Sequence, residues 1–512
     1  MAVTKSSFKV CAWAMLTLLV PAAPAAASPV LHWDGEQLVE RDDPALPPPA
    51  LSDPPAPPGP CAESEPRISA SATSVSQAID RALARKQITE ADATRYRRAY
   101  SAAKSTRGRL GGSYRNELAS VIATLERIAG ADRLTGSRMP ALFLQLERNT
   151  EFWGGDPKFP AREDVPEEPC QRASTGRSGS RIEFAGSQIV YQYYPGNGLQ
   201  IQPLANFGKA NGIYTACRRK ETRCDPAALE LLLDELVAIR SSRGGSTTWE
   251  YWFAFSGGAP PWVSGMAQGT AIQALTRGSV LLKDPSYLAI ARGAIGLFEK
   301  STPTGVRVRG ENGGNHYAIY SFAPGLKVLN AFLQTITGLY DYAKTAKDSK
   351  AMGLFRLGDR SARREVPRYD TGAWSLYSQG GAESNLNYHN VVTDFLENLC
   401  SRTKTGVYCQ KADRFNAYKK AAPRVSYRGP SSTRAGRRTA LSFTLNKVSC
   451  VTATIRDGSG AQVYRSQIKF NRGTRSFTWQ PRTAGTYTLE LDTLDLRKNR
   501  TVVTRTITVK SG

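Results

Sequence analysis

The stretch DPAALELLLDELV, residues 225–237, decides how the middle of the chain folds. Asp225 can accept hydrogen bonds from the unpaired N–H groups of a helix start, and Pro226 suits the first helical position. The apolar residues that follow stand at the spacing of one helix face: Leu229, Leu232, Leu233, Leu236 and Val237. The stretch therefore predicts a helix that packs one face against a core.

The same pattern recurs along residues 181–422. Asp284-Pro285 repeats the start signal, and further apolar faces follow at helical spacing. Their residues are Tyr287, Ile290, Ala294 and Leu297; Leu329, Phe332, Leu333 and Ile336; and Val391, Val392, Phe395, Leu396 and Leu399. Loops that contain Gly, Trp and Tyr join these helices. Such a succession predicts an (α/α) toroid or barrel whose cleft is lined by loops.

Strand patterns flank the helices. Apolar and polar residues alternate over residues 181–194, and Pro195-Gly196-Asn197-Gly198 predicts a turn, so β-structure should precede the helical part. Residues 424–512 hold short β-branched and aromatic runs between turn signals, which predicts an Ig-like β-sandwich. The predicted fold class is therefore multidomain α+β, with an (α/α) toroid or barrel, preceding β-structure and a C-terminal sandwich.

The N-terminal part divides into three segments. Residues 1–27 combine two lysines, an apolar run and an Ala-rich end, as a cleaved signal peptide does. Residues 28–72 are rich in proline and predict a linker without a core of its own. Residues 73–180 are polar and Ala-rich with helical spacing, which predicts an N-terminal helical region.

The signal peptide predicts a secreted, extracellular protein, with association to a cell wall as a further option. Its apolar run is shorter than the ~20 residues that span a bilayer, and no longer run follows, so we expect no transmembrane segment. The Ala-, Arg- and Gly-rich composition suggests a bacterial source.

The chain is strongly basic. Its 68 Lys and Arg against 44 Asp and Glu give a formal net charge of +24. One interpretation is a soluble exported protein with many surface arginines, and the other is a partner rich in negative charge. Nucleic acid is such a partner, but the sequence has no zinc-finger spacing and no RNP-type aromatic string. We therefore expect an acidic polysaccharide as partner and no nucleic acid.

Eight cysteines in an exported chain favour disulfides over a metal site, because the sequence has no CxxC and only three histidines. Cys11 lies in the signal peptide. Three pairings fit the spacing: Cys217 with Cys224, Cys400 with Cys409, and Cys61 with Cys170. Cys450 is then left over. We expect no metal and no cofactor.

Familiar catalytic signatures are absent from the sequence: it has no GxSxG, P-loop, HExxH or Rossmann-type glycine pattern. Tyrosines instead gather in three polar stretches, residues 313–320, 369–377 and 385–390, which also hold two of the three histidines. For any single tyrosine, aromatic packing with a hydrogen-bonded hydroxyl is the plainer interpretation. Three such stretches close together predict a site.

Several ordered motifs resemble the D-glucuronyl C5-epimerase family. Pro261-Trp262-Val263-Ser264-Gly265-Met266-Ala267-Gln268-Gly269, followed by Ala271-Ile272, is similar to the PW-S-MAQGQAI segment of that family. Further similar motifs follow in order: Leu329-Asn330-Ala331-Phe332, Gly338-Leu339-Tyr340-Asp341, Tyr369-Asp370-Thr371-Gly372 and Tyr388-His389. The resemblance spans roughly residues 190–400.

The resemblance implies epimerisation of D-glucuronate to L-iduronate within a polymer, on an (α/α) barrel that is often dimeric. Carried over by motif, the catalytic tyrosines are Tyr320, Tyr377 and Tyr388. The motifs and the tyrosine stretches supply the candidates for substrate binding: Trp262, Gln268, His316, Tyr317, Asn387 and His389. Either histidine could orient a tyrosine or bind a carboxylate, or simply cap a loop.

The chemistry of such a site follows from its substrate. Inverting C5 of a uronate removes a carbon-bound proton next to a carboxylate, so negative charge develops and the carboxyl group must be neutralised. One group takes the proton and another returns one from the opposite face. Tyrosine can do either if positive neighbours lower its pKa from ~10.

The sequence also departs from the family pattern. Ala318 and Ile319 stand where a carboxylate is expected beside the first tyrosine, and Ser378-Gln379-Gly380 replace an expected arginine after the second. Two alternatives to an epimerase therefore stay open. One is a polyuronate lyase, which would remove the same proton and then break the chain. The other is a non-catalytic protein that binds cell-wall polysaccharide.

Overall fold

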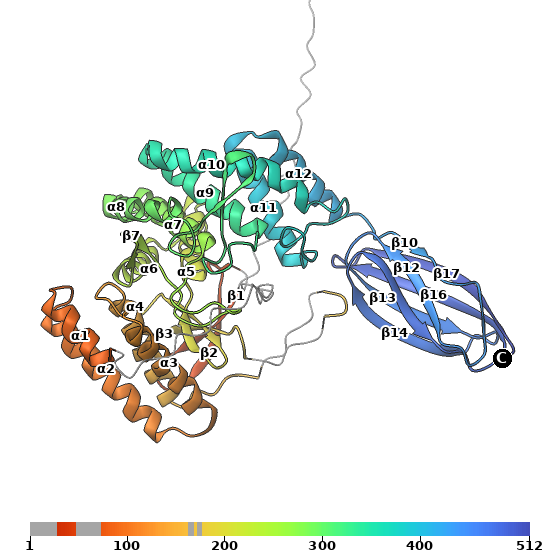
Figure 1. Cartoon of the computed structure of the whole chain (residues 1–512), viewed down its shortest axis with the longest axis horizontal. Coiled ribbons are helices and arrows are strands. Elements are labelled where there is room, and N and C mark those ends of the chain that lie inside the picture. Colours follow the sequence, from red (N-terminus) through yellow and green to blue (C-terminus); the bar gives the residue numbers. More distant parts are fainter. Residues whose placement is uncertain (1–27, 48–72, 162–167, 172–176) are drawn as a thin grey trace, which may run out of the picture.

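The computed structural model describes residues 28–47, 73–161, 168–171 and 177–512, so the signal peptide predicted at residues 1–27 lies outside the described residues. Within these ranges the chain has the mixed helical and sheet, multidomain architecture that the sequence predicts. Figure 1 shows a helical body, with the N-terminal helices at one side and the C-terminal strands extending beyond the other.

Four helices form the N-terminal region. They are α1 (Val75–Ala84), α2 (Glu90–Arg109), α3 (Gly112–Gly130) and α4 (Met139–Gly154). Ser74 and Thr89 cap α1 and α2 by accepting hydrogen bonds from the backbone N–H three residues on. Of the segment 73–180, in which the sequence predicts a helical region, these four helices occupy the part between residues 75 and 154.

A five-stranded sheet connects this region with the central helices. Its strands are β1 (Ser28–Trp33), β2 (Leu38–Asp43), β3 (Arg181–Phe184), β4 (Val190–Tyr194) and β5 (Gly198–Ile201), in the order β2-β1-β3-β4-β5. The pair β1–β3 is parallel and the others are antiparallel.

The prediction of a linker over residues 28–72 is wrong at its beginning. Residues 28–43 form β1 and β2, and Trp33 is only 1% exposed. The pairing that stabilises β1 comes from β3, far along the chain, which local composition does not reveal. The proline-rich residues 48–72 lie outside the described residues.

Eight helices follow the sheet: α5 (Pro203–Arg218), α6 (Pro226–Ala238), α7 (Gly265–Leu281), α8 (Pro285–Ala294), α9 (Leu329–Ala346), α10 (Ser349–Glu365), α11 (Leu386–Thr403) and α12 (Gly406–Tyr418). Short 3₁₀ helices and hairpins interrupt them: η1 (Ile295–Phe298), η2 (Glu311–Gly313), η3 (Val366–Tyr369), β6 (Ser241–Arg243) with β7 (Ser246–Thr248), and β8 (Arg307–Arg309) with β9 (Asn315–Tyr317). None of the helices in the described ranges is both long and apolar enough to cross a membrane.

Helices α7 and α9 run in the same direction. Gln334 donates hydrogen bonds to Thr270 (3.2 Å) and Gln273 (3.0 Å), and Gln273 in turn donates to Asp341 two turns further along α9 (2.8 Å). Arg402, near the end of α11, also binds Asp341. The N-termini of α7, α9 and α11 therefore lie toward one end of the helical body, and their C-termini lie toward the other.

Glycines let α7 and α9 approach closely. A Cβ on Gly269 would lie 2.6 Å from the Cα of Thr335, and a Cβ on Gly338 would clash with the carbonyl of Gly269. Any larger residue would push the helices apart. The spacing of the polar side chains between them therefore depends on these glycines.

The C-terminal unit consists of two sheets. The strands are β10 (Val425–Tyr427), β11 (Ser432–Arg434), β12 (Thr439–Leu445), β13 (Ser449–Arg456), β14 (Gln462–Phe470), β15 (Gly473–Trp479), β16 (Gly485–Asp495) and β17 (Arg500–Lys510). One sheet has the order β10-β12-β15 and the other β11-β17-β16-β13-β14. Buried residues of both sheets, among them Phe443, Ile455, Phe477 and Leu489, belong to one hydrophobic cluster separate from the helical core.

A mixed interface joins this unit to the helices. Trp374 packs with Val448 and Leu496. Lys447 forms a fully buried ion pair with Asp495 at 2.5 Å and donates a hydrogen bond to the carbonyl of Tyr418 at 3.0 Å. Burying this pair is tolerable because both groups are hydrogen-bonded.

Three disulfides form among the described cysteines, and one of them joins two units. Cys217–Cys224 and Cys400–Cys409 form as predicted. The prediction for Cys170 is wrong, because it pairs with Cys450, across 280 residues, rather than with Cys61. Sequence spacing alone favours nearby partners, whereas this bond joins the segment between α4 and β3 to β13. Cys61 lies outside the described residues.

Candidate active site

A cavity of about 510 Å³ opens between the inner faces of α5, α7, α9 and α11. Polar residues line it at helical spacing: Thr270, Gln273 and Arg277 on α7; Asn330, Gln334 and Thr337 on α9; and Asn387, Asn390, Asp394, Asn398 and Arg402 on α11. Helices buried on several sides would carry apolar residues there. The polar stripes therefore mark the cavity as a place for a polar ligand.

Aromatic rings form the wall near the helix N-termini. Tyr251 and Trp262 stack face to face, with ring centroids 4.1 Å apart and planes inclined by 2°. Tyr320 meets the edge of Trp262 at 5.5 Å, and Phe255 lies 5.6 Å from Tyr320. Flat apolar faces bordered by hydroxyl and amide groups suit a sugar ring, which has apolar C–H faces and polar edges.

Backbone and side-chain hydrogen bonds hold this wall. Tyr251 and Trp262 pair through their backbones, and the Trp262 indole N–H donates to the carbonyl of Phe253 at 2.8 Å. The Tyr251 hydroxyl donates to Gln202 Oε1 at 2.8 Å. Since Gln202 precedes the first turn of α5, the wall is fixed to the helical body rather than carried on a separate loop.

The charged groups that line the cavity are three arginines and one aspartate: Arg181, Arg277, Arg402 and Asp394. Burial lowers the pKa of Arg181 to about 10, while Tyr194 and Asp43 act in the opposite direction. Arg181 is 3% exposed, donates to the carbonyl of Pro47 at 2.6 Å, and stays a cation at neutral pH. The cavity therefore favours a negatively charged ligand.

The three predicted catalytic tyrosines lie close together, but only two of them line the cavity. Tyr320 and Tyr388 both line the cavity. Tyr377 is not among the lining residues and packs edge-on against Tyr388, with ring centroids 4.7 Å apart. All three belong to or pack against one aromatic cluster. Tyr377 is thus placed to orient Tyr388 rather than to touch a ligand in the cavity.

Two of the predicted binding residues, Trp262 and Asn387, lie in the cavity wall. Two others from the first tyrosine stretch do not. His316 is fully buried, with Nδ1 2.8 Å from Glu365 Oε2, and the Tyr317 hydroxyl donates to the carbonyl of Leu354 at 2.8 Å. The prediction that His316 and Tyr317 contact substrate is corrected, because β9 directs both side chains into the helical core.

His389 and Gln268 need the same correction. His389 is fully buried, stacks on Trp374 at 3.7 Å and bonds Ser375 and the carbonyl of Phe415. Gln268 is also fully buried and donates to the carbonyl of Trp249 at 2.8 Å. The polar groups of both side chains form hydrogen bonds within the protein. The two residues therefore stabilise the structure around the cavity rather than contact a ligand in it.

The positions that depart from the family pattern are also visible. Ala318 is buried and its carbonyl accepts a hydrogen bond from the N–H of Gly265, while Ile319 lines the cavity. Gln379 pairs through its backbone with Lys327. Positive charge instead comes from Arg181, which belongs to β3.

Sequence reasoning missed Arg181, Asp394 and the arginines at the far end of the cavity. A signal was present for those on helices. Thr270, Gln273 and Arg277 interrupt an otherwise small and apolar helix at intervals of three and four residues, which indicates a polar face inside the protein. No comparable local signal marks Arg181. Among the described residues, no group of three or more His, Cys, Asp or Glu side chains could hold a metal ion.

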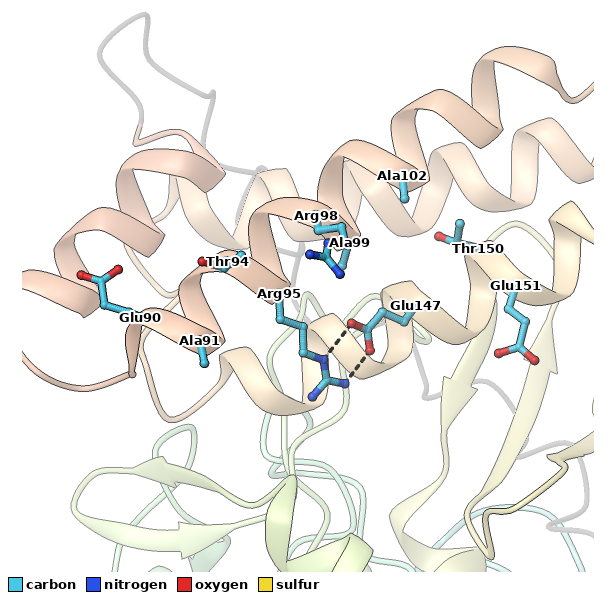
Figure 2. Close-up of a pocket in the computed structure, with 10 residues that line it drawn as sticks. All are labelled: Glu90, Ala91, Thr94, Arg95, Arg98, Ala99, Ala102, Glu147, Thr150 and Glu151. Carbon is cyan, nitrogen blue, oxygen red and sulfur yellow. Dashed lines mark hydrogen bonds and ion pairs between the residues drawn. The ribbon is translucent and has the colours of Figure 1, made fainter.

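A second groove lies on the N-terminal helices. Figure 2 shows it between α2 and α4, where small side chains such as Ala91, Ala99 and Ala102 leave room. Its Arg95 is bound by Glu147 through two hydrogen bonds, of 2.9 and 2.6 Å. The groove has a volume of about 780 Å³, but it lacks the aromatic wall and the inward-facing polar stripes of the cavity described above.

The helical body and the tyrosine-rich wall lie largely in a part of the chain that matches a known protein family. Residues 243–417 match the family described as the D-glucuronyl C5-epimerase C-terminus. These residues are similar to that family. The matched residues include the aromatic wall, α7, α9 and α11, so they hold most of the cavity.

Curated proteins that match part of the chain include the following two. A D-glucuronyl C5-epimerase of Caenorhabditis elegans is 36% identical over 179 residues, which are 31% of this chain and 29% of that protein. An uncharacterised protein of Methanocaldococcus jannaschii is 26% identical over 164 residues, 31% of this chain and 53% of that protein. The chain thus spans about a third to a half of the lengths of these relatives.

Solved structures show only distant likenesses. A D-mannose isomerase is 13% identical with a TM-score of 0.33, over 44% of this chain and 60% of that chain. A cellobiose 2-epimerase from Bacillus thermoamylovorans is 12% identical with a TM-score of 0.27, over 44% of this chain and 62% of that chain. Likenesses of this extent carry no argument about activity.

Proposed function

We propose that this chain is an epimerase that inverts C5 of D-glucuronate, or of a related uronate, within an acidic polysaccharide. The observation that carries the proposal is the presence of Tyr320 and Tyr388 in one cavity with Arg181. Both tyrosines lie in the part of the chain that matches the epimerase family. The match of residues 243–417 to that family supports the reaction class. The lining arginines support an acidic substrate.

In the proposed reaction, one tyrosine as phenolate removes the proton from C5 and its bonding electrons move into the adjacent carboxyl group. The other tyrosine, as phenol, then donates a proton to the opposite face of C5. No bond to a neighbouring sugar breaks. Each turnover leaves the two phenols with exchanged protonation states, which solvent resets.

Negative charge develops on the carboxyl group during this step, and a positive environment must stabilise it. Arg181 supplies a buried cation. The N-termini of α5, α7 and α11 lie beside the aromatic wall, since Gln202, Ser264 and Asn387 line the cavity, and the helix dipoles add partial positive charge there. The same groups would lower the pKa of a nearby tyrosine.

The proposal extends to the rest of the molecule. We propose that the inner and outer helices close as an (α/α) barrel and that the two C-terminal sheets form a sandwich around their shared cluster. The net charge of +24 would attract a polyanion at long range. Export by the N-terminal signal would bring the protein to an extracellular or cell-wall polymer.

An isotope-exchange experiment tests the function. The purified chain is incubated in deuterated water with several polyuronates that differ in the uronate and in its linkage. Deuterium at C5 is followed by proton NMR and chain length by size-exclusion chromatography. We expect exchange at C5 of one polymer, a new C5 epimer and no shortening.

Two other results would replace the proposal. Exchange accompanied by shorter chains identifies a lyase. Binding of a polymer without exchange on any uronate identifies a non-catalytic polysaccharide-binding protein. The lack of a carboxylate at Ala318 and Ile319 would then explain the missing activity.

A further inference from the structure

At the end of the cavity opposite the tyrosines, Arg277 of α7 and Arg402 of α11 meet around Asp341 of α9. Arg402 binds the carboxylate through Nε at 2.7 Å and Nη2 at 2.9 Å, whereas Arg277 approaches it only to 3.4 Å. Both arginines line the cavity. None of the proposed reaction steps uses this cluster.

The cluster carries surplus positive charge. Burial by itself would raise the pKa of Asp341, but Arg402 and Arg277 hold that pKa below its ordinary value, so the carboxylate is ionised at neutral pH. Two guanidinium groups then face one carboxylate. Asp341 also accepts a hydrogen bond from Gln273 at 2.8 Å. Of its three partners, Arg277 therefore makes the longest and weakest hydrogen bond to Asp341.

Arg277 has hydrogen-bonding capacity to spare. A guanidinium has five N–H donors, and the described residues use two of them, toward Asn211 Oδ1 at 2.8 Å and Asp341 Oδ2 at 3.4 Å. Its position is fixed by these contacts and by the ring of Tyr214, 5.3 Å away. The side chain keeps 22% of its surface exposed, and the residue lines the cavity. A fixed cation with unused donors beside a cavity is suited to bind an oxyanion.

Balancing the helix dipole does not account for this arrangement by itself. Cations do stabilise the last turn of a helix, where Arg402 lies in α11, but Arg277 lies before the last turn of α7. That role needs no shared cavity and no convergence from two helices. The convergence places both guanidinium groups on the same end of one ligand-sized space.

The cluster is too far from the tyrosines to bind the reacting carboxylate. Arg402 stands fourteen residues after Tyr388 on α11, which corresponds to ~21 Å at 1.5 Å per residue. This distance exceeds the size of one sugar ring. The amides of Gln273 and Asn398 and the carboxyl group of Asp394 line the path between the two ends.

We propose that Arg277 and Arg402 form a second anion subsite, which binds the acidic group of a sugar unit other than the one undergoing epimerisation. The group is an oxyanion on the polymer, either a carboxylate or a sulfate ester. The inference rests on the proposed function for the nature of the ligand. It implies a substrate with acidic groups at two separated positions along the chain.

The test uses binding rather than turnover, so that it does not depend on catalysis. Oligosaccharides with a D-glucuronate at both ends are compared with oligosaccharides in which one terminal carboxyl has been reduced to the alcohol. A third set carries a sulfate ester at that position. Dissociation constants are measured by titration calorimetry for the full chain, for Arg277→Gln, and for the control Arg85→Gln at the exposed C-cap of α1.

We expect the full chain to bind the doubly acidic oligosaccharide at least tenfold more tightly than the reduced one, as the loss of a charge-assisted hydrogen bond predicts. Arg277→Gln should bind the doubly acidic and the reduced oligosaccharide with the same affinity. Arg85→Gln should show the same preference as the full chain. Arg277→Lys, which keeps the charge but not the planar fork, should recover part of the preference. Preference for the sulfated set would identify the sulfate ester as the ligand.

The subsite is disproved if Arg277→Gln, with an unchanged melting temperature, keeps the full preference. It is equally disproved if the full chain shows no preference between acidic and reduced oligosaccharides. Failure of the proposed function has a different signature: no exchange at C5, with the preference for two acidic groups intact.

Discussion

His389 shows at the scale of one residue how a polar side chain near the site serves the fold. Burial lowers the pKa of His389 to about 4, from an ordinary value of 6.5, although a hydrogen bond to the carbonyl of Phe415 opposes the shift. The unfolded chain therefore binds more protons than the folded chain between these pH values. The contribution of neutral His389 to the free energy of unfolding is fully present above pH 6.5 and decreases as the pH falls toward 4.

We expect the free energy of unfolding to decrease by on the order of 3 kcal/mol across this window because of His389. His389→Gln should flatten the dependence, and urea unfolding at several pH values measures it. His32→Gln is the control, because His32 is partly exposed on β1 and should leave most of the slope in place. An equally steep slope in His389→Gln would contradict the burial argument.

Individual site residues were predictable to different degrees. Trp262, Tyr320 and Tyr388 belong to motifs shared with a family, and they line the cavity. For His316 and His389 the sequence shows a polar residue in a polar stretch, and only the packing decides whether it faces a ligand or the core. Arg181 approaches the cavity from a strand outside the motifs, which a local pattern cannot anticipate.

At the scale of elements, the approach of α7 and α9 is the feature on which the cavity depends. Gly338→Ala would place a methyl group against the carbonyl of Gly269. The helices must then separate, and we expect a loss of about 3 kcal/mol in stability, as overpacking does in tight cores. Thermal unfolding followed by circular dichroism checks this.

Gly353→Ala in α10 is the matched control, because no atom lies within 4 Å of the added methyl group. It should be neutral or stabilising by up to ~1 kcal/mol, as alanine is the better helix former. Equal effects of the two substitutions would mean that the close contact of α7 and α9 contributes little.

Helices were predicted more reliably than strands, for a physical reason. An amphipathic helix carries its signal locally, as residues 225–237 do, and α6 forms there. The strand β1 is stabilised by partners at β2 and β3, and its short apolar run does not reveal them. The common direction of α7, α9 and α11 is likewise a property of their packing and not of any one segment.

At the scale of the whole molecule, Cys170–Cys450 joins the helical body to the C-terminal sheets. A bond that closes so long a loop restricts the unfolded chain strongly, with an effect of up to about 5 kcal/mol. We expect the double variant Cys170→Ser, Cys450→Ser to melt at lower temperature than the parent chain. Differential scanning calorimetry should also show the C-terminal unit unfolding separately, since the remaining interface is small and partly polar.

The control is the double variant Cys217→Ser, Cys224→Ser, which removes a bond across only seven residues and within one unit. Its two units should still melt together. A single transition in both double variants would show that the interface around Trp374 couples the units without the disulfide.

The account as a whole depends on tyrosine hydroxyls that move a proton on and off a sugar carbon. The most direct measurement is the rate of deuterium incorporation at C5 of the preferred polyuronate by the parent chain, Tyr388→Phe and Tyr427→Phe, whose hydroxyl lies in the C-terminal unit. We predict rapid incorporation by the parent chain and by Tyr427→Phe, and a decrease of at least a hundredfold in Tyr388→Phe. Incorporation by a correctly folded Tyr388→Phe at the parental rate would contradict the account.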